Sequence, residues 1–592
     1  MTITKTIWRR LRAGALGLVA CTIACGALAG QQKPEAVKPE AVPTKSEAAP
    51  TKPEAAPTAK PENSFVLKLH DKEIGNASWT QTVGAGGAIQ IDSHAKFKLA
   101  DVAEYTLDSA AAYDAQLRFT GASSKTMVNG NPQPEVKIVV DASGKRVTFR
   151  LSMGADSVDS RRAELRPHTV MLNDFDPSGI ATLLHMYKGE TSLMQFEALL
   201  VKGGGGAGLG SVMYVDDAKG KLKGQAVALK HFLFSVGGVA MDAWSDSDYR
   251  LMRAAANVPG VEYVRDDFVL ESNIPAGVAE TEVKFHSKDL ELPGTITAPA
   301  TTPIAVVVMV QQSGPQDRDE TMGANKPFRD LAWGLAQHGI ASFRYEKRSK
   351  IAPQSLAQAP TLDLEVNDDA VAAIAFIHAK PELKELPIFV LGHALGASMA
   401  PFIVEKAKAA GSPVAGEILM AGVARPADEV LLEQIKTNTP VKQRAVALQE
   451  QKRAFANIRD PKTGNGESAL GIPVGYWRDW LAHDTPAEIK KVNVPTLVLQ
   501  GGKDFQTSVK DYDILKATGD PAHTTARLFP GLNHLFMPST KTGIADYVAP
   551  SHVSNEVVVT IADWIAANAP KAKAAAAPQE NSPPAPAPKL LF

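Results

Sequence analysis

The pattern of apolar and polar positions divides the chain into two regions of different type. Residues 64–272 carry short alternating runs broken by Gly, Asn and Asp, which is the pattern of strands with one buried face. Two such runs, 136–141 and 146–151, flank turn residues that predict a hairpin. The region is therefore predicted to be a β-rich antiparallel sheet or open barrel. We expect a helical end at residues 245–256 and a flexible glycine-rich turn at 203–210.

The second region, residues 280–568, alternates longer apolar runs with helical stretches. Residues 304–310, 387–391 and 495–500 are almost entirely apolar, as expected of parallel strands covered on both faces. An antiparallel pair is predicted before them, and an amphipathic helix at 553–567 closes the region. The fold class is therefore α/β, with a mostly parallel sheet and helices on both faces.

The clearest chemical signal follows the run at 387–391. The sequence Gly392-His393-Ala394-Leu395-Gly396 has glycines two residues either side of its middle, the spacing of a nucleophile elbow between a strand and a helix. Ala394 stands where a serine hydrolase has its attacking serine. We expect Pro401 in the first turn of the following helix, where a missing N–H is harmless. Packing alone also places small residues at this spacing, so the rest of the chain must decide.

Two later strand ends supply the remaining groups of a hydrolytic triad. In folds with this elbow the acid follows the nucleophile and the histidine comes last, each after a later strand. Asp504 follows the run at 495–500, and His534 lies in the loop after a run at 526–530. A single Asp or His at such a place is more often a cap or solvated. The ordered set indicates hydrolase ancestry, with Asp504 as acid and His534 as base.

A Gly- and Pro-containing loop follows the run at 304–310. Its backbone N–H groups at Ser313 and Gly314, with that of Leu395, are candidates for an oxyanion hole. An ordinary turn is the alternative interpretation.

Three runs here resemble a known family: 313–321 (SGPQDRDET), 325–332 (NKPFRDLA) and 343–348 (FRYEKR), with LNHLF at 532–536 in addition. They resemble bacterial α/β-hydrolase-fold proteins of the carboxylesterase and acyl-peptidase-like type over about residues 280–568. The resemblance implies a serine-dependent ester hydrolase with Gly-His-Ser-Leu-Gly at the elbow and a small ester or acyl-peptide ligand. It assigns the acid and base to the two residues named above, and the oxyanion hole to the same loop and Leu395.

Ala394 departs from the family. A methyl group cannot form an acyl-enzyme, and losing a triad member typically lowers turnover by about a millionfold. We expect neither Ser398, one helical turn on, nor Ser313 to substitute. Three hypotheses follow: an impaired esterase-type protein, a non-enzymatic envelope scaffold, or a weak hydrolase using water activated by His534. Natural loss of the serine is favoured over an engineered replacement, since the chain carries an export signal and tails.

Residues 424–490 interrupt the strand and helix alternation with a mostly helical insertion, which is expected to form a cap over the cleft. Its aromatic residues Tyr476, Trp477 and Trp480 are candidates for lining an acyl or alcohol pocket. The alternative is that they pack the cap against the body.

The amino-acid composition argues against nucleic acid, metals and cofactors as partners. Lys and Arg number 63 against 64 Asp and Glu, so no long-range field favours nucleic acid. The chain has 2 cysteines, both near its start, and no dense spacing of metal ligands; we expect no metal and no cofactor.

The ends of the chain indicate export. Residues 1–29 have basic residues before an apolar stretch and are predicted to be a signal peptide, which implies a periplasmic or extracellular protein. Processing at Cys21 would instead give a lipid-anchored protein. The Pro-, Lys-, Glu- and Ala-rich residues 30–63 are expected to be a disordered linker, and residues 569–592 a disordered tail. Residues 64–272 are then a possible cell-envelope component.

Overall fold

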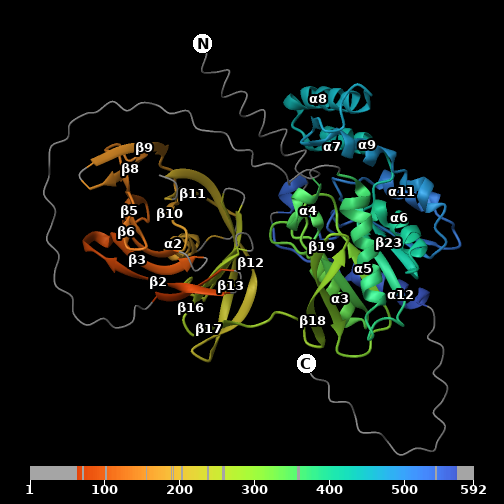
Figure 1. Cartoon of the computed structure of the whole chain (residues 1–592), viewed down its shortest axis with the longest axis horizontal. Coiled ribbons are helices and arrows are strands. Elements are labelled where there is room, and N and C mark those ends of the chain that lie inside the picture. Colours follow the sequence, from red (N-terminus) through yellow and green to blue (C-terminus); the bar gives the residue numbers. More distant parts are fainter. Residues whose placement is uncertain are drawn as a thin grey trace, which may run out of the picture. The chain divides into compact units, whose positions relative to one another are not determined.

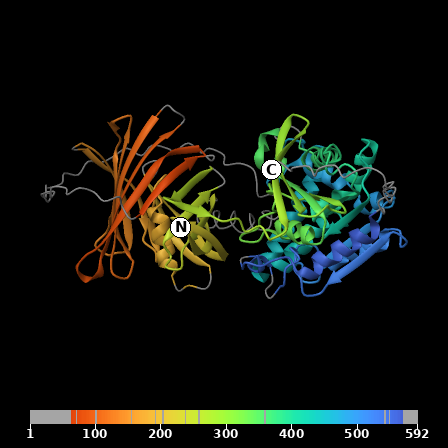
Figure 2. The same ribbon diagram turned by 90° about the horizontal axis from the view of Figure 1, so that it is seen from below.

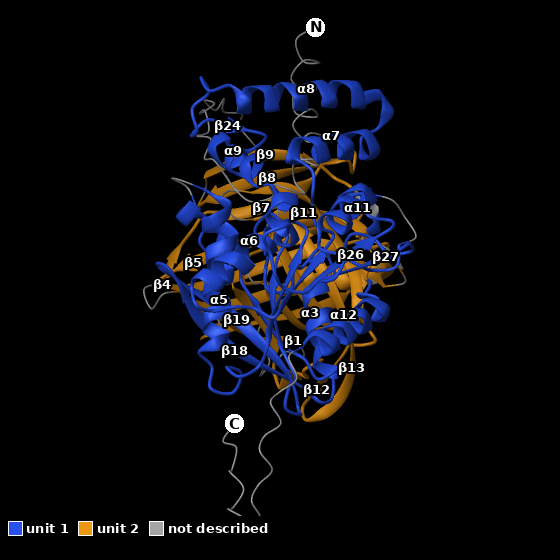
Figure 3. Cartoon of the chain, turned by 90° about the vertical axis from the view of Figure 1, so that its right-hand side faces the viewer, with its two compact units in different colours: residues 1–30, 274–546, 551–592 blue, residues 31–273, 547–550 orange. Residues whose placement is uncertain are grey.

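The computed structural model describes residues 63–569 apart from 70–71, 100–102, 155, 189, 191–192, 202–204, 237–238, 257–259, 357–359, 540–542 and 548. These residues form two compact units (Figure 3). The first contains the described residues up to 273 together with 547, 549 and 550, and the second contains 274–546 and 551–569. The predicted signal peptide, linker and tail lie outside the described residues, except Asn63 and Ala569. In the described part of the chain, no helix is both long and apolar enough to span a membrane.

The first unit is built almost entirely from antiparallel strands (Figures 1 and 2). Strand β1 pairs with both β2 and β16, and the sole parallel pair among the described strands of this unit is β10 with β11. The elements are β1 (Asn63–Leu69), β2 (Lys72–Val83), β3 (Ile89–Leu99), β4 (Ala103–Tyr113), β5 (Phe119–Val128), β6 (Asn131–Pro132), β7 (Glu135–Val140), β8 (Arg146–Met153), β9 (Asp156–Glu164), β10 (Thr169–Leu172), α2 (Ser178–Tyr187), β11 (Met194–Leu200), β12 (Gly206–Leu222), β13 (Gln225–Val236), β14 (Val239–Ser245), β15 (Leu251–Ala256), β16 (Val261–Arg265) and β17 (Phe268–Leu270).

Alternation along these strands builds the core of the unit. In β3, every second residue from Ile91 to Phe97 is buried while the residues between them are exposed, as a strand with one covered face requires. Helix α2 adds Leu183 and Leu184 to the same apolar cluster. The predicted hairpin is confirmed, since β7 and β8 pair antiparallel across it.

Two sequence expectations for this unit were wrong. Residues 251–256 form strand β15 between β14 and β16 instead of a helix, because pairing on both sides outweighs the helical preference of Met, Arg and Ala. Gly206 and Gly210 lie in β12, paired with β11, instead of in a flexible turn. A Cβ at Gly210 would come within 2.4 Å of the Phe196 ring, so the glycine makes room for that ring.

The second unit contains an eight-stranded sheet in the order β18-β19-β21-β20-β22-β23-β26-β27. Strand β19 pairs antiparallel with β18 and β21, and the strands from β21 to β27 in this order run parallel, as the sequence predicted. The elements are β18 (Val278–Ser287), β19 (Leu290–Pro299), β20 (Val306–Val310), α3 (Pro327–Gln337), β21 (Ala341–Tyr345), α4 (Arg348–Ile351), a π-helical turn (Asp363–Asn367), α5 (Asp368–His378), β22 (Ile388–His393), α6 (Leu395–Ala409), β23 (Gly416–Met420), α7 (Ala427–Asn438), α8 (Val441–Arg459), β24 (Ser468–Ala469), β25 (Ile472–Pro473), α9 (Val474–Ala482), α10 (Thr485–Ile489), β26 (Thr496–Gly501), α11 (Val509–Thr518), β27 (Thr524–Phe529) and α12 (Asn555–Asn568). This arrangement is the α/β-hydrolase fold.

Helices cover both faces of this sheet (Figure 1). On one face, α5 and α6 join the cluster that contains Val308 and Val390. On the other face, Trp564 of α12 packs edge-on against Phe389 of β22, with ring centroids 5.7 Å apart. The insertion at 424–490 is mostly helical, as predicted, and α7, α8 and α9 share an apolar cluster of their own.

Candidate active site

The segment around Ala394 has the backbone of a nucleophile elbow. Ala394 adopts φ 50° and ψ −108°, between the last residue of β22 and the first of α6. The two glycines are sterically required, since a Cβ at Gly392 would lie 2.2 Å from the Gly396 oxygen and one at Gly396 would lie 2.1 Å from the Val310 oxygen. Strand, turn and helix therefore meet too closely for any larger residue at either position.

The helix after the elbow begins earlier than expected. It starts at Leu395, directly after the turn, so Pro401 lies in the helix interior and not in its first turn. The prediction was wrong because only Ala394 separates the end of the strand from the start of the helix. Pro401 has no N–H, so it cannot donate the usual helical bond to the Ala397 carbonyl.

The predicted acid and base contact each other. His534 Nδ1 lies 2.7 Å from Asp504 Oδ2, and both side chains are almost fully buried. The Asp504 carboxylate also accepts the backbone N–H groups of Gln506 (2.7 Å) and Thr507 (2.9 Å), which fixes its orientation. A carboxylate on Nδ1 keeps the proton there and leaves Nε2 as the basic nitrogen.

A second buried pair, which the sequence analysis did not identify, joins the elbow to the His534 loop. His393 Nδ1 lies 2.8 Å from a Glu320 carboxylate oxygen, and its Nε2 lies 2.9 Å from the His534 carbonyl oxygen. Burial opposes protonation, but the charge and hydrogen bond of Glu320 raise the pKa of His393 above its ordinary value. Both ring nitrogens face acceptors, an arrangement that favours the protonated ring. The signal in the sequence was a charged residue inside the 313–321 run.

The loop after β20, which contains the candidate oxyanion donors Ser313 and Gly314, is held by hydrogen bonds at Gln312 and Ser313. Glu320 accepts the backbone N–H of Gln312 at 2.6 Å, and the Gln316 side-chain amide donates to the Ser313 carbonyl at 3.1 Å. Gly314 has φ 86°, a conformation that favours glycine. Leu395 is the first residue of α6, so its N–H has no acceptor within the helix, and its role as an oxyanion donor stays a prediction.

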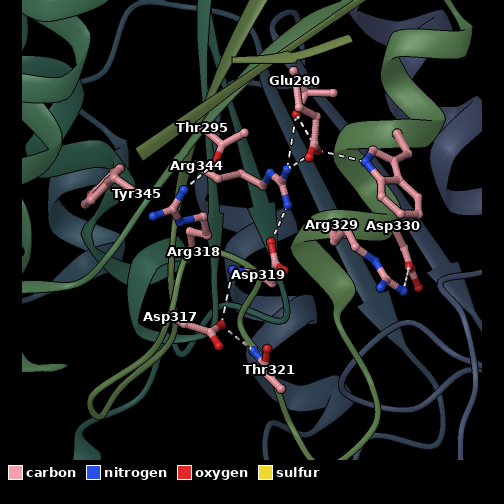
Figure 4. Close-up of polar contacts among 12 residues, drawn as sticks. Glu280, Thr295, Asp317, Arg318, Asp319, Thr321, Arg329, Asp330, Arg344 and Tyr345 are labelled. Atoms are coloured by element: carbon pink, nitrogen blue, oxygen red, sulfur yellow. Dashed lines mark hydrogen bonds and ion pairs between the residues drawn. The ribbon is translucent and has the colours of Figure 1, made fainter. Parts of the chain in front are cut away.

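The outer half of the loop is anchored by charges. Figure 4 shows Arg344 between Glu280 and Asp319, and Arg318 beside Thr295, a residue of β19. The Arg344 guanidinium lies 2.5 Å from the Glu280 carboxylate. Asp317 accepts the N–H of Asp319 at 3.1 Å, which closes a tight turn. Successive charged residues of the 313–321 run therefore each bond a different partner, which explains why this run is distinctive.

Ser398 does not replace the missing nucleophile. Its hydroxyl oxygen lies 3.1 Å from the Ala394 carbonyl and 3.0 Å from the Val423 carbonyl, which share its single proton as acceptors, and it accepts the Val423 N–H at 3.0 Å. These bonds tie α6 to the loop after β23. Among the described residues, no group of three His, Cys, Asp or Glu side chains is arranged to hold a metal ion.

The three cap aromatics lie together. The Tyr476 hydroxyl donates to Glu365 at 2.5 Å, and the Trp480 ring stacks on Trp477 with centroids 5.6 Å apart. Trp477 is 1% exposed and packs against Phe455 inside the cap. These contacts are those of the packing alternative; a pocket role for Tyr476, Trp477 and Trp480 stays a prediction.

Sequence comparison agrees with this geometry. Residues 325–539, which include Ala394, Asp504 and His534, match the family described as serine aminopeptidase, S33. Esterase EstD of Thermotoga maritima is 34% identical over 290 residues, covering 48% of this chain and 68% of that esterase. The chain belongs to the esterase-type family of α/β-hydrolases.

Solved structures also match this esterase-family chain. Dienelactone hydrolase from Anabaena variabilis ATCC 29413 is 14% identical and has a TM-score of 0.31, covering 49% of this chain and 99% of that one. Est1E from Butyrivibrio proteoclasticus is 12% identical with a TM-score of 0.33, covering 48% and 99%.

Proposed function

We propose that this esterase-family protein binds a small ester or acyl-peptide ligand in its α/β-hydrolase cleft and is impaired in hydrolysing it because Ala394 stands at the nucleophile position. The observation that supports this most is the elbow at φ 50° carrying a methyl group, beside an ordered Asp504–His534 pair. The proposal accounts for both the family-like arrangement of the site and the missing serine hydroxyl at position 394.

The remaining groups have defined tasks. The N–H groups of Leu395 and the Ser313–Gly314 loop would stabilise negative charge on the ligand carbonyl oxygen. His534 Nε2 would accept a proton, with Asp504 stabilising the resulting imidazolium. With no hydroxyl at residue 394, only water is left to attack, and this route is slow because water is not held as a positioned side chain is.

We further propose that the protein acts outside the cytoplasm. The support is the basic and apolar pattern of residues 1–29, which lie outside the described residues. The β-rich first unit is then available for a cell-envelope role, with the hydrolase unit as the ligand-binding part.

Restoring the serine tests the proposed function. Ala394→Ser adds one oxygen to a backbone already in the elbow conformation, so hydrolysis of short-chain nitrophenyl esters should rise by about a thousandfold or more. Rates are compared with those of the unmodified chain. The double variant Ala394→Ser with His534→Ala should lose the gain.

Two outcomes would contradict the proposal. A well-folded Ala394→Ser protein that hydrolyses no ester of a broad panel, and that a phosphonate probe does not label, would favour a scaffold without catalysis. Substantial ester turnover by the unmodified chain, abolished by His534→Ala, would show that water activation replaces the serine.

A further inference from the structure

A chain of buried polar contacts links the cap to the oxyanion loop. The Tyr476 hydroxyl on α9 donates to Glu365 at 2.5 Å, and Glu365 pairs with Lys347 at 3.0 Å. Lys347 Nζ then donates to the Gln312 carbonyl at 2.9 Å. Lys347, Glu365 and Tyr476 are 2%, 6% and 8% exposed. Ester chemistry as described above uses none of the three.

The last of these hydrogen bonds, from Lys347 to the Gln312 carbonyl, fixes the peptide group between Gln312 and Ser313. A peptide unit is planar and trans, so its carbonyl and its N–H point in opposite directions. By holding the Gln312 carbonyl, Lys347 sets the direction of the Ser313 N–H, a predicted oxyanion donor. Glu320 holds the N–H of Gln312 on its other side. Gln312 is thus held by two charged side chains from different elements.

Glu365 stays charged in this series of buried polar contacts. Burial alone would raise the pKa of Glu365, but Lys347 and the Tyr476 hydroxyl lower it below its ordinary value. Glu365 is therefore an anion paired with a buried cation. Burying such a pair is costly and does little for stability by itself, so the pair calls for another role. Glu365 also lies in a π-helical turn, Asp363–Asn367, a type of turn frequent at functional sites.

We propose that Lys347 is a positioning residue of the oxyanion hole, and that Glu365 and Tyr476 make its position depend on the seating of cap helix α9. The oxyanion donor is then correctly aimed only while α9 lies in the position seen here. Ligands whose acyl or alcohol group fits beneath α9 keep the hole intact, and ligands that displace α9 weaken it. This proposal rests on the proposed function.

The kinetic test uses the Ala394→Ser protein as its starting point. Lys347→Met combined with Glu365→Gln removes both buried charges and so avoids leaving one unpaired. It should lower kcat by about a hundredfold, as loss of an oxyanion donor does, with KM changed by less than about threefold. Lys347→Arg, which keeps the positive charge, should retain more of kcat than that double variant. Tyr476→Phe should lower kcat by about three- to tenfold. Tyr512→Phe, a buried tyrosine on α11, is the matched control and should leave kcat unchanged.

A raised KM with unchanged kcat in the Lys347 variants would overturn the proposal, because it would place them in ground-state binding. Hydrogen exchange on the unmodified Ala394 chain gives an independent readout. Tyr476→Phe should speed amide exchange in residues 311–316 several-fold relative to Tyr512→Phe, and equal exchange would overturn the coupling. If Ala394→Ser stays inactive while exchange responds to Tyr476→Phe, the proposed function fails and the coupling stands.

Discussion

At the scale of single residues, the elbow keeps its strained backbone although no hydroxyl benefits from it. A positive φ at a residue with a Cβ costs on the order of 1 kcal/mol. At Ala394 this strain is imposed by Gly392 and Gly396, whose close approach to neighbouring backbone leaves the chain no other path. The conformation is therefore a property of the strand–helix junction and does not depend on the serine. For this reason a serine introduced at position 394 should adopt the elbow conformation without any change in the backbone.

A buried carboxyl on the same sheet predicts a pH dependence. Burial raises the pKa of Glu417 from 4.5 to about 8, and its one hydrogen bond is from the Thr496 hydroxyl at 3.0 Å. The folded protein retains a proton that the unfolded chain releases, so this group's stabilising contribution is complete below about pH 4.5 and declines as pH rises towards 8. Glu417→Gln cannot ionise and should gain on the order of a few kcal/mol over the unmodified chain at high pH.

The measurement is the urea unfolding free energy of the hydrolase unit between about pH 5 and pH 9, followed by helical circular dichroism. The difference between Glu417→Gln and the unmodified chain should widen with pH. Glu385→Gln, on a side chain 88% exposed, is the control and should follow the unmodified chain. Parallel curves for the unmodified chain and Glu417→Gln would show that Glu417 does not titrate in this range.

At the scale of elements, the parts predictable from sequence were those set by local patterns. The apolar run before Gly392 predicted the strand, and the spacing of the glycines, taken with Asp504 and His534 after later strands, predicted the elbow. Strand β15 was missed because its residues favour helix locally and only pairing with β14 and β16 makes them a strand. The Glu320–His393 pair was missed for the same reason, since it joins residues 73 positions apart.

The cap is expected to unfold locally, separately from the sheet, because α7 to α9 bury a small core of their own. Trp477 is its largest fully buried side chain, and its indole N–H donates to the Ala469 carbonyl at 2.9 Å. Trp477→Ala should cost the cap about 3 to 5 kcal/mol and speed hydrogen exchange in residues 427–482, with the strands of the eight-stranded sheet unaffected.

Trp564→Ala is the matched comparison for that cap variant. Trp564 packs on Phe389 of the central strand, so its loss should speed exchange in the sheet and not selectively in the cap. If Trp477→Ala instead raised exchange equally in sheet and cap, the cap would not be an independent unfolding element.

At the scale of the whole molecule, each of the two described units has a large apolar core of its own. Residues such as Phe65, Phe149 and Phe232 form the core of the first unit, while Val308, Val390 and Ile403 belong to the core of the second. The connecting residues around 273 belong to neither apolar core. Units with separate cores generally fold on their own.

The expected outcome is two unfolding transitions in the full chain, one for each core. A fragment starting at residue 274 should keep the helical circular dichroism of the second unit and melt within about 5 °C of the corresponding transition, since its core is complete. In the Ala394→Ser form, the fragment should also retain most of the esterase activity, because the elbow, Asp504 and His534 all lie within it. A fragment that melts much lower or loses that activity would mean that the first unit stabilises the hydrolase fold, and a single shared transition would mean the same.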